Sequence, residues 1–154
     1  MANASKTVEM VVSFEKLWNV ITDYEKYPNF VEGVKSVKIL SPKLLHDVKA
    51  TEYKDPSKRI EYNVSLLGKE IRYILDHIED KKTGQMSWSL IESNFFKSNE
   101  GSWKLSKLAE NKLEVTYSLS LDFNIYVPGL VLNQLVKSSL PKMISGFEKQ
   151  ANSV

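Results

Sequence analysis

Two ionisable side chains stand at the ends of apolar, alternating stretches of the sequence, His77 and Glu92. His77 continues the two-residue period of the apolar positions in 71–75, and Glu92 continues that of 86–90. Side chains of equal parity point to the same face of a strand. An inward imidazole or carboxyl group can then serve as a general acid or base. The alternative is that both residues lie at strand ends, where polar side chains are commonly solvated.

Other kinds of chemistry lack the residues that they need. The chain has no cysteine, and its two histidines, His46 and His77, are far apart and belong to no ligand-like cluster. We therefore expect no metal and no cofactor. The sequence contains neither a glycine-rich phosphate loop nor a nucleophile elbow. The formal net charge is only +2, which gives no reason to expect DNA binding or strong RNA binding.

Large aromatic side chains occupy many of the positions that alternation assigns to the inner face. Their rings supply apolar area, while a tyrosine hydroxyl or an indole N–H offers a ligand one polar contact. Methionine and leucine adapt to the shape of what they contact. The residues expected to line a ligand cavity are Tyr62, Tyr73, Leu75, Met86, Trp88, Trp103, Tyr117, Leu119, Val131, Leu135 and Met143. The alternative for these residues is ordinary core packing.

Alternation of apolar and polar residues marks several strands in the middle of the chain, most clearly at 113–123. Turn-forming segments of hairpin length, such as 81–84, separate the alternating runs. Strands with one apolar and one polar face are typical of an antiparallel sheet. We expect seven or eight strands. The region 44–58 is the least clearly patterned, and Val48 and Ala50 are its best inward pair.

The N-terminal part predicts a strand followed by two short helices. Residues 6–12 alternate, and Ser13 then stands where a helix N-cap is expected, before the amphipathic run 14–21. Pro28 disfavours helical geometry at Tyr27. We therefore expect the first helix to end near Asp23–Tyr24 and a second short helix to begin at Pro28.

A long helix is predicted over residues 127–150. Pro128 fits its first turn, and Pro141 is expected to kink it. After Pro141 the apolar positions fall within about 100° of arc, as in a helix packed on a core. Before it they spread over roughly two-thirds of the circumference. This excess either packs against neighbouring loops or lines the mouth of an apolar pocket.

Three stretches together resemble a known family. Residues 20–40 are similar to a D-x-x-x-Y-P-x-F signature and the strand after it. Gly101-x-Trp103 begins a later strand, and residues 127–149 resemble a terminal helix with a leading proline and a later Leu-Pro pair. The family is the polyketide cyclase/dehydrase-like branch of the START-like (helix-grip, SRPBCC) superfamily, and the sequence most resembles its coenzyme-Q-binding proteins. The resemblance implies an α+β fold, with a curved antiparallel sheet wrapped around a long C-terminal helix.

The same resemblance implies a hydrophobic cavity between the sheet and the long helix. Members of the family bind lipids, polyketides, quinones or other apolar molecules, and only some catalyse a reaction, so the fold alone does not name the function. The first hypothesis is a carrier or chaperone of such a molecule. The second is a cyclase or dehydratase, with His77, Glu92 or a tyrosine as acid or base. The third is an interaction module, because one branch is described as a ribosome-associated toxin.

The remaining expectations concern organisation and location. Residues 1–154 have a length typical of one domain, and no repeat or linker divides them. The N-terminal stretch lacks the pattern of a signal peptide, and no window of about 18 apolar residues predicts a transmembrane segment. We therefore expect a single helix-grip domain in the cytoplasm.

Overall fold

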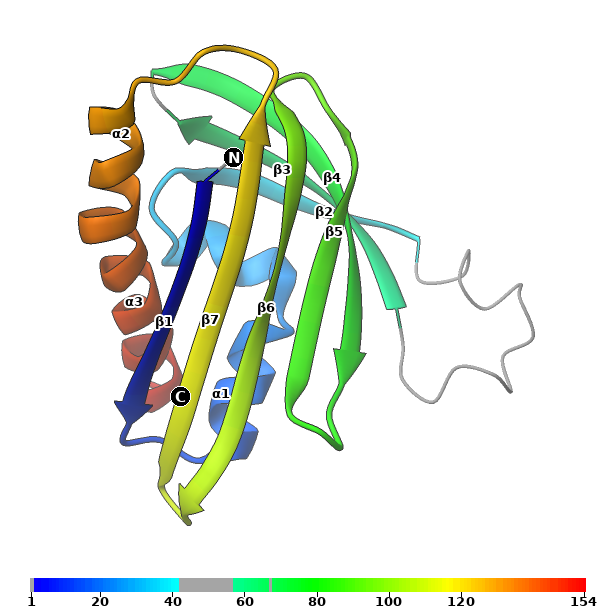
Figure 1. Cartoon of the computed structure of the whole chain (residues 1–154). Coiled ribbons are helices and arrows are strands. Elements are labelled where there is room, and N and C mark those ends of the chain that lie inside the picture. The colour runs from blue at the N-terminus through cyan, green and yellow to red at the C-terminus, as the bar shows by residue number, and fades with distance from the viewer. Residues whose placement is uncertain (1, 42–56, 67) are drawn as a thin grey trace.

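A computed structural model describes residues 2–41, 57–66 and 68–154. The elements follow the predicted order of a strand, two short helices, a series of strands and a terminal helix (Figure 1). The strands are β1 (Ala2–Met10), β2 (Val34–Ser41), β3 (Ser57–Leu66), β4 (Lys69–Asp80), β5 (Gln85–Ser93), β6 (Phe96–Ala109) and β7 (Lys112–Phe123). The helical segments are α1 (Phe14–Ile21), the 3-10 helix η1 (Tyr24–Asn29), α2 (Gly129–Gln134), the π-helix η3 (Leu135–Ser139) and α3 (Leu140–Asn152).

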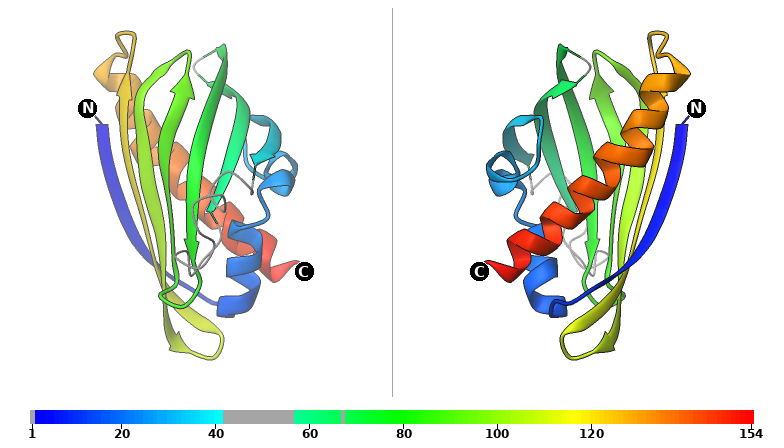
Figure 2. Two further views of the ribbon diagram at one scale, coloured as in Figure 1. Left: turned by 90° about the vertical axis from the view of Figure 1, so that its right-hand side faces the viewer. Right: turned by 90° about the vertical axis from the view of Figure 1, so that its left-hand side faces the viewer.

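The seven strands of the described residues form one antiparallel sheet in the order β1-β7-β6-β5-β4-β3-β2. Neighbours in the sheet are neighbours in sequence, except that β1 lies beside β7. The sheet curves, and the terminal helix crosses its concave face (Figure 2). This is the predicted α+β helix-grip architecture. The expected inward pair Val48 and Ala50, like His46, lies outside the described residues.

The two short helices differ from the prediction in one boundary. Ser13 caps α1 as expected, and its Oγ accepts a hydrogen bond from the Lys16 N–H at 3.3 Å. The prediction that the second helix begins at Pro28 is wrong, because η1 begins at Tyr24. A short 3-10 helix has few internal hydrogen bonds for a proline to remove. The side chains of Tyr24 and Tyr27 are buried, and the Tyr27 hydroxyl donates to the carbonyl of Ile21. Burial of these two rings therefore holds η1 against the core.

The core lies where α1, η1 and α3 meet the sheet. Leu17 and Ile21 of α1 are fully buried, and α1 contacts α3. The ring of Phe147 in α3 lies 5.4 Å from the ring of Tyr27 and 4.9 Å from that of Trp103, centroid to centroid. We call α1, η1 and α3, with the strand residues that they cover, the closed half of the molecule.

The opposite end of the sheet is less completely filled. No residue of α2 or η3 is buried. In β7 the inward side chain of Tyr117 is buried, whereas Leu119 and Leu121 are only partly buried. We call α2 and η3, with residues 2–5 of β1 and 118–123 of β7, the open half. In the described parts of the chain, no helix combines the length and the apolar character that crossing a membrane requires.

The terminal helix changes its winding just before Pro141. The Leu140 N–H donates to the carbonyl of Leu135, five residues back, which is the bond of a π-helix. Proline has no N–H, and in an α-helical turn its ring would press on the carbonyl four residues back, that of Lys137. The wider turn accommodates the ring. The sequence predicted a kink at Pro141, and the structure places a π-helical turn there.

Candidate functional site

A cavity of about 830 Å³ lies between the concave face of the sheet and the terminal helix. The sheet, η1 and the residues after it, and all three segments of the terminal helix contribute to its wall. Small-molecule sites commonly have volumes of about 300–1,000 Å³. The cavity is therefore large enough for a drug-sized ligand.

Every residue that the sequence predicted as cavity lining does line this cavity. Their contact with a ligand stays a prediction. His77 also lines it, and so do Tyr27 and Phe30 of the signature stretch. Ala2 and Ala4 of β1 are lining residues that the sequence reasoning missed. Both residues belong to the open half, where their small side chains leave room in the cavity.

Aromatic rings form much of the sheet side of the cavity. Tyr62 and Tyr73 are stacked, with centroids 5.1 Å apart and planes 14° from parallel. Tyr117 contacts Trp88 at 5.5 Å and Trp103 at 4.8 Å between centroids. Rings in such arrangements hold one another in place. The wall is thus a connected aromatic surface rather than a set of separate side chains.

Gly101, part of the resemblance on which the family was inferred, has a steric role in this wall. It pairs with Trp88 across β5 and β6. A Cβ atom at Gly101 would lie 2.5 Å from the Trp88 ring and 2.3 Å from the Ser118 carbonyl oxygen. Real Cβ atoms do not approach so closely, so the indole can take its place only above a glycine.

His77 lies inside the molecule and not in water at a rim. It is 3% exposed, because β4 continues three residues beyond it to Asp80 and the Tyr24 ring covers it at 4.6 Å. The Tyr62 hydroxyl lies 2.8 Å from His77 Nε2, and Met86 Sδ lies 3.2 Å from Nδ1. A thioether can only accept a hydrogen bond. The proton therefore sits on Nδ1, and Tyr62 donates to Nε2.

Four ionisable groups in the interior of the cavity wall, those of His77, Tyr62, Tyr73 and Tyr117, are uncharged at neutral pH. Burial, and next the positive charge of Lys58, lowers the pKa of His77 to about 3. Burial likewise raises the pKa values of Tyr62, Tyr73 and Tyr117. None of these groups is poised to exchange a proton near pH 7.

Charges close to His77 are paired with one another outside the cavity wall. Glu79 is buried, accepts a hydrogen bond from the Tyr24 hydroxyl at 2.7 Å, and forms an ion pair with Lys58 at 3.2 Å. The Lys58 ammonium also lies 5.5 Å from the centre of the Tyr24 ring. A buried carboxylate needs such partners. The charges of Lys58 and Glu79 therefore compensate each other, and neither residue lines the cavity.

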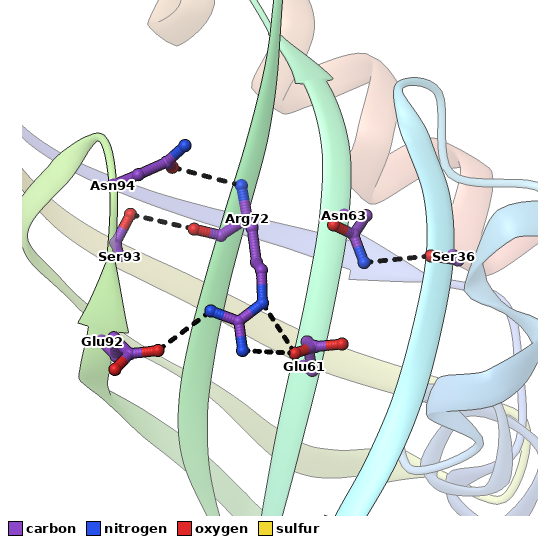
Figure 3. Close-up of polar contacts among 7 residues, drawn as sticks. All are labelled: Ser36, Glu61, Asn63, Arg72, Glu92, Ser93 and Asn94. Carbon is purple, nitrogen blue, oxygen red and sulfur yellow. Dashed lines mark hydrogen bonds and ion pairs between the residues drawn. The ribbon is translucent and has the colours of Figure 1, made fainter.

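Of the two alternatives for Glu92, the inward one is wrong and the solvated one is confirmed. Its side chain is 61% exposed and lies on the outer face of the sheet (Figure 3). There its Oε2 accepts from Arg72 Nη1 at 2.9 Å, and Arg72 also pairs with Glu61. Glu92 is part of a surface ion-pair network on the face of the sheet opposite the cavity.

A β-bulge explains this reversal. Leu90 pairs with Leu75, as two inward residues should, but Glu92 pairs with Ile74, the residue just before Leu75 in β4. Two steps along β5 thus correspond to one step along β4. Ile91 is therefore an extra residue in β5, and the inward–outward alternation changes phase after it. Counting parity from residues 86–90 cannot reveal such an insertion.

Among the described residues, Asn99 is the buried polar cavity residue that the sequence reasoning missed. It is 6% exposed and lines the cavity beside Trp88, whose Nε1–H donates to Asn99 Oδ1 at 3.1 Å. The predicted strand began at Gly101, whereas β6 begins at Phe96. Asn99 shares the parity of Gly101 and Trp103, so extending the alternation by one step would have found it.

Charged residues occur in the cavity wall only at its rim, among the described residues. Glu32 and Lys142 are highly exposed and form an ion pair at 3.2 Å, and Lys149 is exposed. Over the described ranges there is no group of three or more His, Asp or Glu side chains that could hold a metal ion.

Comparison with known proteins places the chain in a family. The model of the family described as polyketide cyclase/dehydrase and lipid transport matches residues 10–148. The chain belongs to this family. The match runs from the end of β1 to α3 and so includes the elements that form the cavity, except most of β1. No curated protein matches the sequence of this member of the polyketide cyclase/dehydrase and lipid transport family.

Solved structures of similar fold include three that this family member covers almost completely. A START superfamily protein from Mycobacterium smegmatis is 20% identical, with a TM-score of 0.79 and 99% of each chain covered. The Zhui aromatase/cyclase from Streptomyces sp. R1128 is 12% identical, with a TM-score of 0.77, covering 97% of this chain and 93% of that one. A protein from Thermus thermophilus is 16% identical, with a TM-score of 0.74 and coverage of 98% and 97%. At these identities the likeness shows the START-like fold alone.

Proposed function

We propose that the protein binds a hydrophobic small molecule in the cavity, of the quinone, lipid or polyketide class, and acts as its carrier or chaperone. The observation that carries this proposal is the wall itself, which is apolar and aromatic, uncharged in its interior and about 830 Å³ in volume. In the open half, apolar residues of α2 and η3 line the cavity without being buried by the protein. A bound apolar molecule would remove them from water.

Two further observations support this choice of ligand classes. The description of the family includes lipid transport, and one protein of similar fold is an aromatase/cyclase. The resemblance of residues 20–40 to coenzyme-Q-binding proteins adds quinones to the set. All three classes share a large apolar body with few polar atoms, which is what this wall accommodates.

Native mass spectrometry of the purified protein, before and after organic extraction, tests the proposal. We expect either a co-purified apolar molecule or, after extraction, binding of quinones, fatty acyl compounds or a fluorescent apolar dye. A protein that is empty and binds none of these contradicts the proposed function.

Substitutions at two neighbouring residues of β1 test whether the dye binds in the cavity. Ala4 lines the cavity, whereas Ser5 is exposed on the other face and contacts Ser118. Ala4→Trp should fill the open half and abolish dye binding, while Ser5→Trp should leave it unchanged. Equal binding by both variants would place the dye elsewhere on the molecule.

A cyclase or dehydratase is the second candidate, because His77 and Tyr62 form a hydrogen-bonded pair within the cavity wall. In such an enzyme the pair would transfer a proton to or from a polyketide-type substrate. Turnover of an aromatic polyketide precursor should then be lost in His77→Gln and Tyr62→Phe while affinity is kept. Equal turnover in the wild type and both variants removes this candidate.

A further inference from the structure

The cavity wall contains a hydrogen-bond donor that the protein leaves without a partner. The Trp88 indole can only donate, so the Asn99 atom that it contacts at 3.1 Å must be the amide oxygen. The amide nitrogen, Nδ2, is then on the other branch of the side chain. No hydrogen bond to Nδ2 exists among the described residues, although Asn99 is only 6% exposed.

The unpartnered nitrogen remains accessible from the cavity. Among the described residues, Ser98 Oγ is the one buried side-chain polar atom that is both fully occluded and unpartnered. Asn99 Nδ2 is not occluded in this way, and Asn99 lines the cavity. Tyr73 and Tyr117 also line it, and their hydroxyls have no hydrogen-bond partner in the described parts of the chain. A buried donor without a hydrogen-bond partner costs free energy. These three groups therefore indicate a ligand that supplies a hydrogen-bond acceptor.

The charge distribution indicates what kind of acceptor this is. The charged lining residues are exposed at the rim, and Glu32 and Lys142 neutralise each other. No described cation of the cavity interior would compensate a carboxylate or phosphate placed beside Asn99. Transfer of an unpaired anion to such a site is strongly unfavourable. A neutral carbonyl oxygen accepts the same hydrogen bond without that penalty.

The shape of the wall indicates the body that carries the carbonyl group. Asn99 is joined to Trp88, which contacts Tyr117, and Tyr73 is stacked on Tyr62 nearby in the same wall. Flat rings pack on such faces in offset or edge-on arrangements. A planar ring system with a carbonyl oxygen at its edge can pack on the aromatic surface and accept a hydrogen bond from the Asn99 amide.

We propose that the preferred ligand is a neutral, planar aromatic carbonyl compound of the quinone type, whose carbonyl oxygen accepts a hydrogen bond from Asn99 Nδ2. This inference rests on the proposed function and narrows it, because it selects among ligand classes of the same cavity. It separates quinone-type and aromatic polyketide-type molecules from fatty acids and anionic lipids.

Three probes of matched size test the inference by calorimetric titration of the full chain. Menadione carries ring carbonyls, methylnaphthalene has the same ring system without them, and naphthoate carries an anionic carboxylate. Because the chain has no cysteine, menadione cannot form a thiol adduct. We expect menadione to bind at least about tenfold more tightly than methylnaphthalene, and naphthoate to bind most weakly.

Two substitutions of Asn99 locate the contact. Asn99→Asp keeps an oxygen for Trp88 but loses the donor, and Asn99→Leu loses both. Each should weaken menadione binding by about five- to fiftyfold and leave methylnaphthalene binding within about twofold. The matched control is Asn63→Leu on the outer face, where Asn63 contacts Ser36 (Figure 3). It should change neither affinity, and thermal melting of each variant checks its fold.

The outcomes separate this inference from the function on which it rests. Equal affinity of the wild type for menadione and methylnaphthalene, or tighter binding of naphthoate, overturns the carbonyl preference but leaves a hydrophobic binder. A menadione preference that survives both Asn99 substitutions overturns the role of Asn99. Failure to bind any of the three probes, together with fatty acyl compounds and apolar dyes, contradicts the proposed function itself.

Discussion

The two ends of the terminal helix are built from similar apolar residues but have different surroundings. In α3, side chains one turn apart are buried, among them Leu140, Ile144 and Phe147. In α2 and η3 no side chain is buried, and Leu130 is 85% exposed. The difference arises because α1 and η1 cover the sheet only in the closed half, where α1 contacts α3.

This contrast separates stability from binding along one helix. The closed half contains a complete core, so it can hold the helix in place without help from a ligand. In the open half, apolar residues line the cavity and are not buried by the protein, so a bound molecule would be needed to bury them. Substitutions in α3 should therefore change the free energy of unfolding, and substitutions in α2 and η3 should change affinity.

The largest expected effect is on the closed half. Phe147 is 2% exposed and contacts the rings of Tyr27, Phe30 and Trp103. Phe147→Ala should lower the free energy of unfolding by about 3–5 kcal/mol, measured by urea denaturation. Leu130→Ala in the open half should change it by no more than about 0.5 kcal/mol. Similar losses for the two variants would mean that the halves do not differ in the way described.

A smaller effect is expected from the glycine beneath the aromatic wall. In Gly101→Ala the added methyl group meets the Ser118 carbonyl oxygen, which is backbone, as well as the Trp88 ring. We expect a loss of about 2–3 kcal/mol and weaker ligand binding, because Trp88 must move. Gly129→Ala is the matched control, since its methyl group would meet nothing within 4 Å. It should be neutral or slightly stabilising in urea denaturation.

His77, which the Tyr24 ring covers in the closed half, should make stability depend on pH. Its pKa is lowered from 6.5 to about 3 in the folded protein. Between these values the unfolded chain binds more protons, so the free energy of unfolding falls as pH falls below 6.5. From pH 7 to pH 5 this amounts to about 2 kcal/mol. His77→Gln should flatten the pH profile by that amount. A profile of unchanged slope would show that the imidazole is not buried in its neutral form.

Alternation in the sequence was sufficient to predict the sheet and many of the strand residues that face the cavity. Residues such as Tyr62, Trp88 and Tyr117 point inward because each strand is apolar on one face only. The apolar pattern of residues 127–150 predicted the terminal helix, and the resemblance implied that the sheet wraps around it. These features depend on local period and on element order, both of which can be read from one chain.

What the sequence did not reveal depends on pairing between strands. The bulge at Ile91 that turns Glu92 outward is defined by the register of β4 and β5. The start of β6 at Phe96, which brings Asn99 into the wall, depends on its pairing with β7. The burial of His77 needs Tyr24, more than fifty residues away in the chain. Such contacts between distant segments leave no periodic signal.

The smallest expected change in stability tests the open half most directly. Leu135 lines the cavity and is only partly buried, so Leu135→Ala should cost about 1 kcal/mol or less in urea denaturation. If a ligand covers this side chain, the lost apolar contact should weaken binding of menadione or an apolar dye by about tenfold. Leu130→Ala is again the control, because Leu130 lies on the same helix but not in the cavity wall. Its affinity should match that of the wild type. A Leu135→Ala variant that is strongly destabilised but binds normally would assign this residue to the core, and the boundary between the halves would then lie before η3.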